Sequence, residues 1–460
     1  MVFSSLLFLF WFMPIFFVLY YLVPYSAKNT VLFIGSIVFY GWGEPKYLLL
    51  IFASILVNYL SGLIIERCQL SENIAAKRTA FVLTLCFDIG MLLFFKYADF
   101  FVTNLNAVLG RELIFPPRLT LPLGISFYTF QIMSYVIDLY RGRVKAEHSI
   151  LNLGTYLVMF PQLIAGPIVV YSQVNRELKE RSITLSQIGD GLRVFILGLS
   201  SKVLIANNIG QLWEELSELG YENISMPLAW LGAVAFTLQI FFDFNGYSLM
   251  AIGLGKLLGF EFPANFDFPY ISISISEFWR RWHMTLGAWF REYLYIPLGG
   301  NRRGRIRTYV NLFIVWFVTG FWHGAGWNFV LWGLYFFVLI ALERLFLGSF
   351  LAKHRAFAHI YTLFFVVVSW VIFSITDFSG LGVYFSRMFS FYFGEEIWYY
   401  LGNYGVILCV GLLFSTPFCK EAYHRVGTKP FGQLLHIGLL VLCVAYLADA
   451  SFNPFLYFRF

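Results

Sequence analysis

The chain of 460 residues is 59% hydrophobic and only 13% charged. Soluble domains carry about 25% charged residues, so this composition excludes an ordinary soluble protein and predicts helices that face lipid and one another. The net charge of +6 resides in polar loops, and it therefore reports membrane orientation rather than nucleic-acid binding. Five scattered cysteines form no paired motif, so neither a disulfide framework nor a thiolate metal site is expected.

Apolar stretches long enough, or nearly so, to cross about 30 Å of hydrocarbon recur along the chain. The first has no basic flank and no small-residue cleavage site, so we expect it to be retained as a membrane span. Spans are predicted at residues 5–23, 46–65, 80–96, 119–139, 190–206, 227–250, 360–376, 400–417 and 433–450, with a shorter one at 30–43.

Residues 150–170 are apolar but contain the stretch PQLIAGP, with Pro161, Gly166 and Pro167. Proline interrupts a helix, and irregular backbone at membrane depth must be shielded by protein. We therefore expect a broken or re-entrant segment here. No repeat, low-complexity tract or linker divides the chain, so we predict a single all-α integral membrane domain over residues 1–460.

Charged loops alternate in sign along the chain. The two acidic loops, 211–222 and 393–398, are expected outside the cell. The positive-inside rule places the basic loops in the cytoplasm. These basic loops are residues 66–78, 141–145, 176–181, 302–307 and 420–429.

The stretch GFWHGAGW at residues 320–327 interrupts an apolar region and surrounds His323 with glycines. The run before it, residues 310–321, is about 18 Å long as a helix, so it ends inside the bilayer if it starts at the cytoplasmic surface. A titratable ring is unfavourable there unless it is hydrogen-bonded or lines a cavity. His323 is therefore a candidate catalytic base, and a hydrogen-bonded core histidine is the alternative.

A second histidine lies in residues 272–305, which predict an amphipathic helix that begins near Ser274. At helical spacing His283 shares an aromatic face, from which it can approach His323. Imidazoles can take a proton from an attacking alcohol and return it to a leaving group. The alternative for His283 is a structural hydrogen bond to a backbone carbonyl. The sequence has no nucleophile elbow, phosphate loop or metal-spaced histidine pair, so we expect no metal.

Several stretches of the sequence are familiar: FPANFDFPYISISISEFWRRWHMTLGAWFREYLYIPLGGNRRG, NLFIVWFVTGFWHGAGWNFVLWGLY, MFPQLIAGPIVVYS, DFNGYSLMAIGLGKLLGF and the end NPFLYFRF. They resemble the membrane-bound O-acyltransferase (MBOAT) family, in particular its bacterial branch typified by the alginate O-acetylation membrane subunit. The resemblance covers almost the whole chain and is most specific at residues 265–333. It implies about 10–12 transmembrane helices with re-entrant and amphipathic helices, and cavities from both sides that meet near mid-membrane. It also implies that His323 is the principal catalytic residue and His283 the second signature position.

By the same resemblance, we expect transfer of an acetyl group from cytoplasmic acetyl-CoA across a bacterial inner membrane to an extracytoplasmic polysaccharide. A secreted or tethered acyltransferase partner is implied, in addition to the acyl-CoA and membrane lipids. The basic residues 301–307 can contact the donor's phosphates, although positive-inside charge also explains them. No residues are otherwise assigned to the donor.

Two other functions stay open at this point. One is D-alanyl transfer to teichoic acid from a carrier-protein thioester. The other is transport of a lipid-linked or small solute, because broken helices with polar groups also mark transporters. The two related halves of a transporter are not evident in the sequence.

The C-terminal stretch SFNPFLYFRF is too apolar to lie in water. It is interpreted either as an interfacial aromatic anchor or as a tail that folds back to the outer cavity, with Tyr457 carrying the acyl group as a phenyl ester. Asp88 and Asp243 interrupt apolar segments, and we expect both to form hydrogen bonds between helices. Asp243 with Asn245 is also considered as part of a cavity lining.

Overall fold

The chain folds into helices only, over the residues that the computed structural model describes, 1–427, 429–449 and 456. This confirms the predicted all-α class. The helices form two compact units, which are described separately here. The first unit contains Met1–Leu192 and Ala251–Pro263, and the second contains Arg193–Met250 and Ala264–Phe460.

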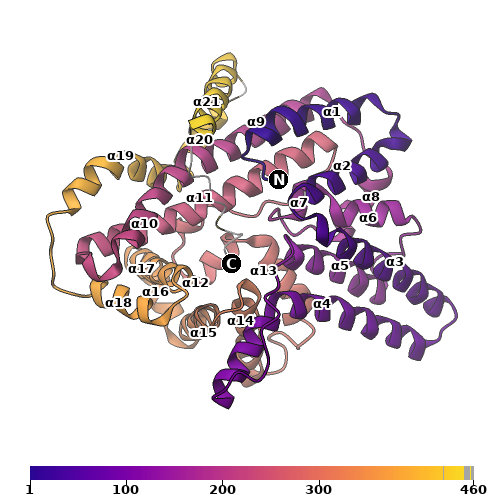
Figure 1. The fold of residues 1–460 in the computed structure, drawn as a ribbon, viewed down its shortest axis with the longest axis horizontal. Coiled ribbons are helices and arrows are strands. Elements are labelled where there is room, and N and C mark those ends of the chain that lie inside the picture. The colour runs from indigo at the N-terminus through magenta and orange to yellow at the C-terminus, as the bar shows by residue number, and fades with distance from the viewer. Residues whose placement is uncertain (428, 450–455, 457–460) are drawn as a thin grey trace. The chain divides into compact units, whose positions relative to one another are not determined.

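The boundaries between the units include points inside two helices, α9 (Leu185–Ser200) and α11 (Met226–Leu258). This agrees with the absence of a linker composition in the sequence. Figure 1 labels the helices in chain order.

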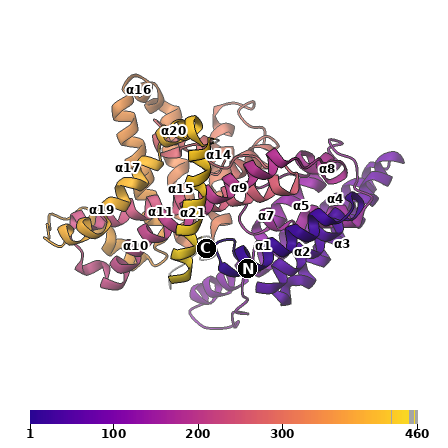
Figure 2. The ribbon, with the colours of Figure 1, turned by 90° about the horizontal axis from the view of Figure 1, so that it is seen from above.

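The first unit is built from helices that pack pairwise, α3 on α4, α4 on α5 and α2 on α6 (Figures 1 and 2). Its helices are the π-helical turn η1 (Phe8–Phe12), α1 (Met13–Leu22), α2 (Lys28–Gly43), α3 (Leu48–Leu70), α4 (Ile74–Leu109), α5 (Ile125–Tyr140), α6 (Ile150–Val158), α7 (Phe160–Leu163) and α8 (Tyr171–Lys179).

The predicted break at PQLIAGP is present in the first unit. Helix α6 ends at Val158, and only the short helix α7 follows before the chain becomes irregular. The Tyr156 hydroxyl lies 3.0 Å from the carbonyl oxygen of Val169, beyond the break. Residues 153–169 are buried in protein, as irregular backbone at membrane depth requires.

The second unit holds the remaining helices, with α14 packed on α15 and α15 on α17. Its helices are the π-helical turn η4 (Ser201–Ala206), α10 (Asn207–Leu219), α12 (Ile275–Arg281), α13 (Met284–Phe290), the π-helical turn η7 (Arg291–Tyr295), α14 (Arg305–His323), α15 (Trp327–Leu342), the π-helical turn η8 (Glu343–Leu347), α16 (Gly348–Lys353), α17 (Arg355–Ser374), α18 (Phe378–Met388), α19 (Ile397–Phe414), α20 (Phe418–Val426) and α21 (Pro430–Asp449).

Seven helices among the described residues are long and apolar enough to cross a membrane, and a shorter apolar helix covers Phe8–Leu22. Many of their large apolar side chains are exposed, as expected for helices that face lipid. The chain is therefore a multi-pass membrane protein. The seven are Pro45–Leu70, Ile74–Leu109, Met226–Leu258, Trp327–Lys353, Arg355–Ser374, Ile397–Phe414 and Pro430–Asp449.

The two acidic loops lie together in the second unit. The backbone N–H of Ser225 donates to a carboxylate oxygen of Glu396 at 3.2 Å, and the N–H of Met226 donates to the carbonyl oxygen of Tyr392 at 2.9 Å. The Tyr404 hydroxyl also contacts the Glu215 carboxylate. The two acidic segments, 211–222 and 393–398, therefore lie near one another in this unit. Residues 211–219 belong to helix α10 rather than to a loop, which corrects the predicted loop there. Their location outside the cell stays a prediction.

The predicted amphipathic helix from near Ser274 to Pro297 is interrupted, although its start is right. Ser274 caps α12 by accepting the N–H of Glu277 at 3.0 Å, but the helix ends at Arg281 and α13 begins at Met284. The reason is a long-range pairing with the loop at residues 265–267. Asn265 accepts the Met284 N–H at 2.9 Å, and Asp267 donates its N–H to Arg281 at 3.0 Å. These bonds replace those that a continuing helix would make.

Helix α14 also differs from its prediction, because it begins at Arg305 rather than near residue 310. Its 19 residues rise about 28 Å, so the arm that ends at His323 is longer than the predicted ~18 Å. Gly304, with φ of 85°, supplies the left-handed turn that precedes the helix. The two arginines of the first turn were left out of the prediction because only apolar residues were counted.

Candidate active site

His323 is the last residue of α14, at the interruption predicted from the sequence. Gly324 continues in an extended conformation, and the helix resumes as α15 at Trp327. The imidazole is therefore at the carboxyl end of a helix, where the partial negative charge of the free carbonyl groups favours a cation. His323 is 8% exposed.

Close packing of α14 against α15 fixes this position. A Cβ atom added at Gly320 would overlap the carbonyl oxygen of Phe329, and one added at Gly333 would overlap that of Trp316. The two helix backbones therefore approach so closely that only glycine fits at the crossing. Gly320 acts in helix packing and not in opening the helix, and the interruption itself is confined to Gly324, Ala325 and Gly326.

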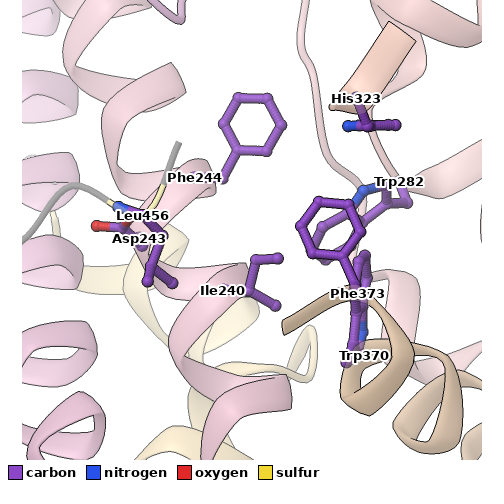
Figure 3. A pocket seen from close by; sticks show the side chains of 8 residues that line it. All are labelled: Ile240, Asp243, Phe244, Trp282, His323, Trp370, Phe373 and Leu456. Atoms are coloured by element: carbon purple, nitrogen blue, oxygen red, sulfur yellow. The ribbon is translucent and has the colours of Figure 1, made fainter. Parts of the chain in front are cut away.

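His323 lines a small pocket in the second unit (Figure 3). The walls are mainly aromatic and aliphatic, and His323 and Asp243 are the two ionisable side chains of the lining. The lining residues come from α11 (Ile240, Asp243, Phe244), from the chain just before α13 (Trp282), from α17 (Trp370, Phe373) and from the C-terminal segment (Leu456).

Three aromatic rings surround the His323 imidazole. Its centroid lies 4.9 Å from that of Trp332, 5.4 Å from Phe373 and 5.0 Å from Trp322. All three rings are inclined to it by between 76° and 80°. Such a shell keeps bulk water from the ring and lowers the local dielectric, which strengthens electrostatic interactions at the imidazole.

His283 lies in the interruption between α12 and α13, with a left-handed φ of 44°. Its Nδ1 is 3.0 Å from Oδ1 of Asn265. Thr285 donates its hydroxyl to the same oxygen at 2.9 Å, while the Asn265 Nδ2 donates to Ser248 at 3.1 Å. The amide orientation is thereby fixed, so Nδ1 of His283 carries the hydrogen. The expected structural bond exists, but its acceptor is a side-chain amide rather than a backbone carbonyl.

Burial lowers the pKa of His283 to about 3, because a charged ring loses its hydration there. The side chain is therefore neutral at physiological pH. A neutral ring that is protonated at Nδ1 has its lone pair on Nε2, which can accept a hydrogen bond.

Both histidine rings lie near the ring of Trp322. The Trp322 ring centroid lies 6.3 Å from that of His283 and 5.0 Å from that of His323. Phe244 lines the pocket and also packs edge-to-face on His283, with centroids 4.8 Å apart. His323 is thus part of the pocket wall, whereas His283 lies next to the residues that form it.

A family model described as MBOAT, membrane-bound O-acyltransferase family, matches residues 143–385, which include both histidines. The chain belongs to the membrane-bound O-acyltransferase family. It is therefore an O-acyltransferase.

Two of three relatives of this MBOAT chain match most of its length. A protein of Pseudomonas putida named probable alginate O-acetylase AlgI is 37% identical over 100% of both chains. A peptidoglycan O-acetyltransferase of Helicobacter pylori is 35% identical over 81% of this chain and 77% of its own. A teichoic acid D-alanyltransferase of Streptococcus thermophilus is 28% identical over 46% of this chain and 54% of its own.

Some residues of this MBOAT site were not singled out from the sequence. Lys202 forms a buried ion pair with Asp243, and Asn265 holds His283. A lysine within the apolar stretch 190–206 was the available signal for the first. The signal for the second was an asparagine between two phenylalanine-rich runs, which is weak without the fold.

The two aspartates that interrupt apolar segments, Asp88 and Asp243, both have polar partners in the structure. Asp88 of α4 accepts the Asn58 side-chain N–H of α3 at 2.9 Å, as expected for a bond between helices. Asp243 pairs with Lys202 and lines the pocket, so the considered cavity role has structural support. Asn245 is half-buried and is not among the lining residues. Tyr457 lies outside the residues that the structure describes.

Proposed function

We propose that this MBOAT member transfers an acetyl group from acetyl-CoA to a hydroxyl group that ends on an extracytoplasmic polysaccharide, with His323 as general base. The observation that carries the proposal is the His323 imidazole in the wall of a pocket at the interruption between α14 and α15. The names of two relatives that match most of the chain, a probable alginate O-acetylase and a peptidoglycan O-acetyltransferase, support acetyl as the group and a polysaccharide as the acceptor.

In the proposed reaction an acceptor hydroxyl attacks the carbonyl carbon of the acetyl thioester. His323 takes the hydroxyl proton as the new C–O bond forms, the C–S bond breaks, and the imidazolium returns a proton to the departing sulfur. The products are an O-acetyl ester and free CoA thiol. General acid–base catalysis of this kind contributes about 10²–10⁴-fold. The helix end at His323 favours the imidazolium, and surrounding aromatic rings attract cations.

His283 is proposed as a positioning residue in this reaction. Its ring is fixed by Asn265 and packs on Phe244 of the pocket wall. Because it is neutral, it can accept a hydrogen bond without adding a second charge to the site. Its removal would loosen the wall rather than remove the base.

Tyr457 is proposed as the first acceptor. Attack of its phenol oxygen on the thioester would give a phenyl ester and CoA thiol, and a second transfer would move the acetyl group to the polymer through a secreted or tethered partner. The support is the position of Leu456, the preceding residue, in the pocket lining.

Acetyl-CoA is proposed to arrive from the cytoplasm at a bacterial inner membrane, where the two cavities implied by the family resemblance would meet at His323. The exposed basic residues 301–307 lie at the start of α14 and just before it, and they offer arginines for the donor's phosphates. The position of His323 at the far end of that helix is consistent with a route along α14.

The test uses purified protein in vesicles with radiolabelled acetyl-CoA. We expect rapid labelling of Tyr457 in the parent, and a loss of about 10²-fold or more in His323→Ala. The control is His359→Ala, because His359 bonds the Ser272 carbonyl oxygen and is not among the pocket residues. Tyr457→Phe should abolish protein-bound label while leaving the unfolding temperature unchanged.

Three other outcomes of this test would each contradict a different part of the proposal. Labelling only from a D-alanyl-loaded carrier protein would replace acetyl transfer by D-alanyl transfer, for which the match is shorter and less identical. Polymer acetylation that persists in His323→Ala would remove the general base and favour transport. Unchanged polymer acetylation in Tyr457→Phe would remove the acyl-tyrosine step alone.

A further inference from the structure

A buried ion pair lies beside the pocket, between η4 and α11. Lys202 Nζ is 2.6 Å from Oδ1 of Asp243, and the two side chains are 2% and 3% exposed. The same ammonium donates to Asn207 Oδ1 at 2.8 Å. Burying two charges is unfavourable by several kcal/mol per ion, and apolar replacements are often as stable. Stability alone is therefore a weak reason for such a pair at this place.

The second carboxylate oxygen of Asp243 has a different partner. Oδ2 accepts the backbone N–H of Leu456 at 2.9 Å, a buried contact between residues 213 positions apart in the chain. The Leu456 side chain is 5% exposed and belongs to the pocket lining. In Figure 3, Asp243 and Leu456 lie together on one side of the pocket and His323 lies on the other.

We propose that Asp243, held by Lys202, is a positioning residue that anchors the backbone of Leu456 and keeps the C-terminal end of this chain at the pocket of His323. Lys202 engages one carboxylate oxygen, which leaves the other aimed at the peptide N–H. A charged acceptor makes a stronger hydrogen bond than a neutral one. The anchor binds backbone rather than side chain, so it fixes the place of the segment independently of the residue at position 456.

The function that we give to this anchor rests on the proposed transfer at His323. The contact between Asp243 and Leu456 does not depend on that transfer. Tyr457 is the residue next to Leu456 in the sequence. Fixing Leu456 therefore limits how far the proposed acyl carrier can move from the pocket, and it raises the effective concentration of the phenol near the base. Without the anchor, each encounter of the chain end with the donor would need a separate ordering step.

The test needs a variant that removes the acceptor without leaving a buried charge alone. The double variant Lys202→Met with Asp243→Leu does so, whereas Asp243→Ala would strand the ammonium and could unfold the protein. The double variant Lys202→Met with Asp243→Asn also removes both charges but retains an acceptor oxygen for the Leu456 N–H. Thr237→Val is the matched control, because Thr237 is buried on the same helix, bonds within it and is not among the pocket residues.

The measurement is the rate at which N-ethylmaleimide labels a cysteine placed at position 456 of the full chain in vesicles. Mass spectrometry of that peptide separates the label from the native cysteines. We expect slow labelling in the Leu456→Cys protein and with Thr237→Val, and a rate within about threefold of these with Lys202→Met and Asp243→Asn. The double variant Lys202→Met with Asp243→Leu should label roughly tenfold faster, since the hydrogen bond has been lost.

Two results would overturn the anchor. One is that Lys202→Met with Asp243→Leu labels as slowly as the Leu456→Cys protein alone, and the other is that the Leu456→Cys protein labels fast while Lys202 and Asp243 are intact. Acetyl transfer is then measured with leucine restored at position 456. The double variant with Asp243→Leu should lose about tenfold or more in kcat while KM for acetyl-CoA stays within about threefold, because the arginines of residues 301–307, proposed to contact the donor's phosphates, are unchanged. His323→Ala keeps the two ideas apart: if it still transfers acetyl groups, the proposed base fails while the labelling result for the anchor stands.

Discussion

His283 has a left-handed backbone conformation and a hydrogen-bond partner, Asn265, that is itself held in place. A non-glycine residue with φ of 44° is uncommon, and histidine, asparagine and aspartate tolerate this region better than others. Asn265 fixes the conformation from two sides, through its carbonyl oxygen to Met284 and its side chain to His283. The residue types that fit here are therefore those that combine left-handed tolerance with a polar side chain.

This predicts a rank order of stability for substitutions at position 283. His283→Asn keeps a short polar group for Asn265, so its unfolding temperature should stay near that of the parent. His283→Val should lose about 1–3 kcal/mol, because a β-branched residue is strained at positive φ and because the buried Asn265 oxygen loses one of its hydrogen-bond donors. The ranking is read by thermal unfolding in detergent, and a valine variant as stable as the asparagine variant would contradict it.

Protonation of His283 makes the stability of the folded protein depend on pH. Its folded pKa is about 3, while an unfolded histidine titrates near 6.5, so the unfolded chain binds more protons below pH 6.5. Stability is therefore lost as pH falls below 6.5, by up to ~1.4 kcal/mol per pH unit from this group. Between pH 7 and pH 5 the parent should lose more stability than His283→Asn. Equal losses in both proteins would show that this ring does not carry the effect.

At the scale of elements, the crossing of α14 and α15 determines where His323 is held. Gly320 and Gly333 face one another at the closest point, with their Cα and backbone N atoms within contact range of an added Cβ. The α15–α17 packing then brings Phe373 to the imidazole. Displacement of α14 relative to α15 would therefore change the distance between His323 and the rest of the pocket.

Alanine at position 333 is expected to separate these helices. Its methyl group would overlap the Trp316 carbonyl oxygen, and overpacking against backbone reduces stability by roughly 1–3 kcal/mol. Transfer should fall with it, because His323 shifts from its place. Gly402→Ala is the control, since Gly402 is within helix α19 and nothing lies within 4 Å of an added Cβ. That variant should be neutral or gain about 0.5–1 kcal/mol. Thermal unfolding and acetyl transfer of both variants decide the matter, and an undisturbed Gly333→Ala would contradict this role.

Elements of this chain were predictable where a local signal decides them. Hydropathy located six of the seven candidate membrane helices, the exception being Trp327–Lys353, whereas the spans predicted at 119–139 and 190–206 are not among the seven. The Ser274 cap located the start of α12, and glycines located the interruption at His323. The break at His283 was missed because it is made by distant hydrogen bonds from residues 265–267, which leave no trace in helical periodicity. The pairing of Lys202, Asp243 and Leu456 was missed for the same reason.

For the molecule as a whole, the direction of acetyl transfer depends on which loops face the cytoplasm and which face outside. In the second unit, Glu396 of one acidic segment accepts the N–H of Ser225, which follows the other segment, and the two segments therefore lie near one another. The basic residues 301–307 are exposed and cover the start of α14 and the residues before it. Acetyl-CoA is a cytoplasmic anion, so the proposed reaction requires the basic loop inside and the acidic end outside.

Single-cysteine accessibility tests this orientation. We expect a membrane-impermeant maleimide to label Glu218→Cys in intact cells, and Arg303→Cys only after the membrane is permeabilised, because both positions are exposed and only the membrane separates them from the reagent. Peptide-resolved mass spectrometry distinguishes these sites from the exposed native Cys86 and Cys409. Labelling of Arg303→Cys in intact cells with protection of Glu218→Cys would invert the chain in the membrane. The basic residues before α14 would then face away from the cytoplasmic donor, and the proposed direction of transfer would fail even with His323 as the base.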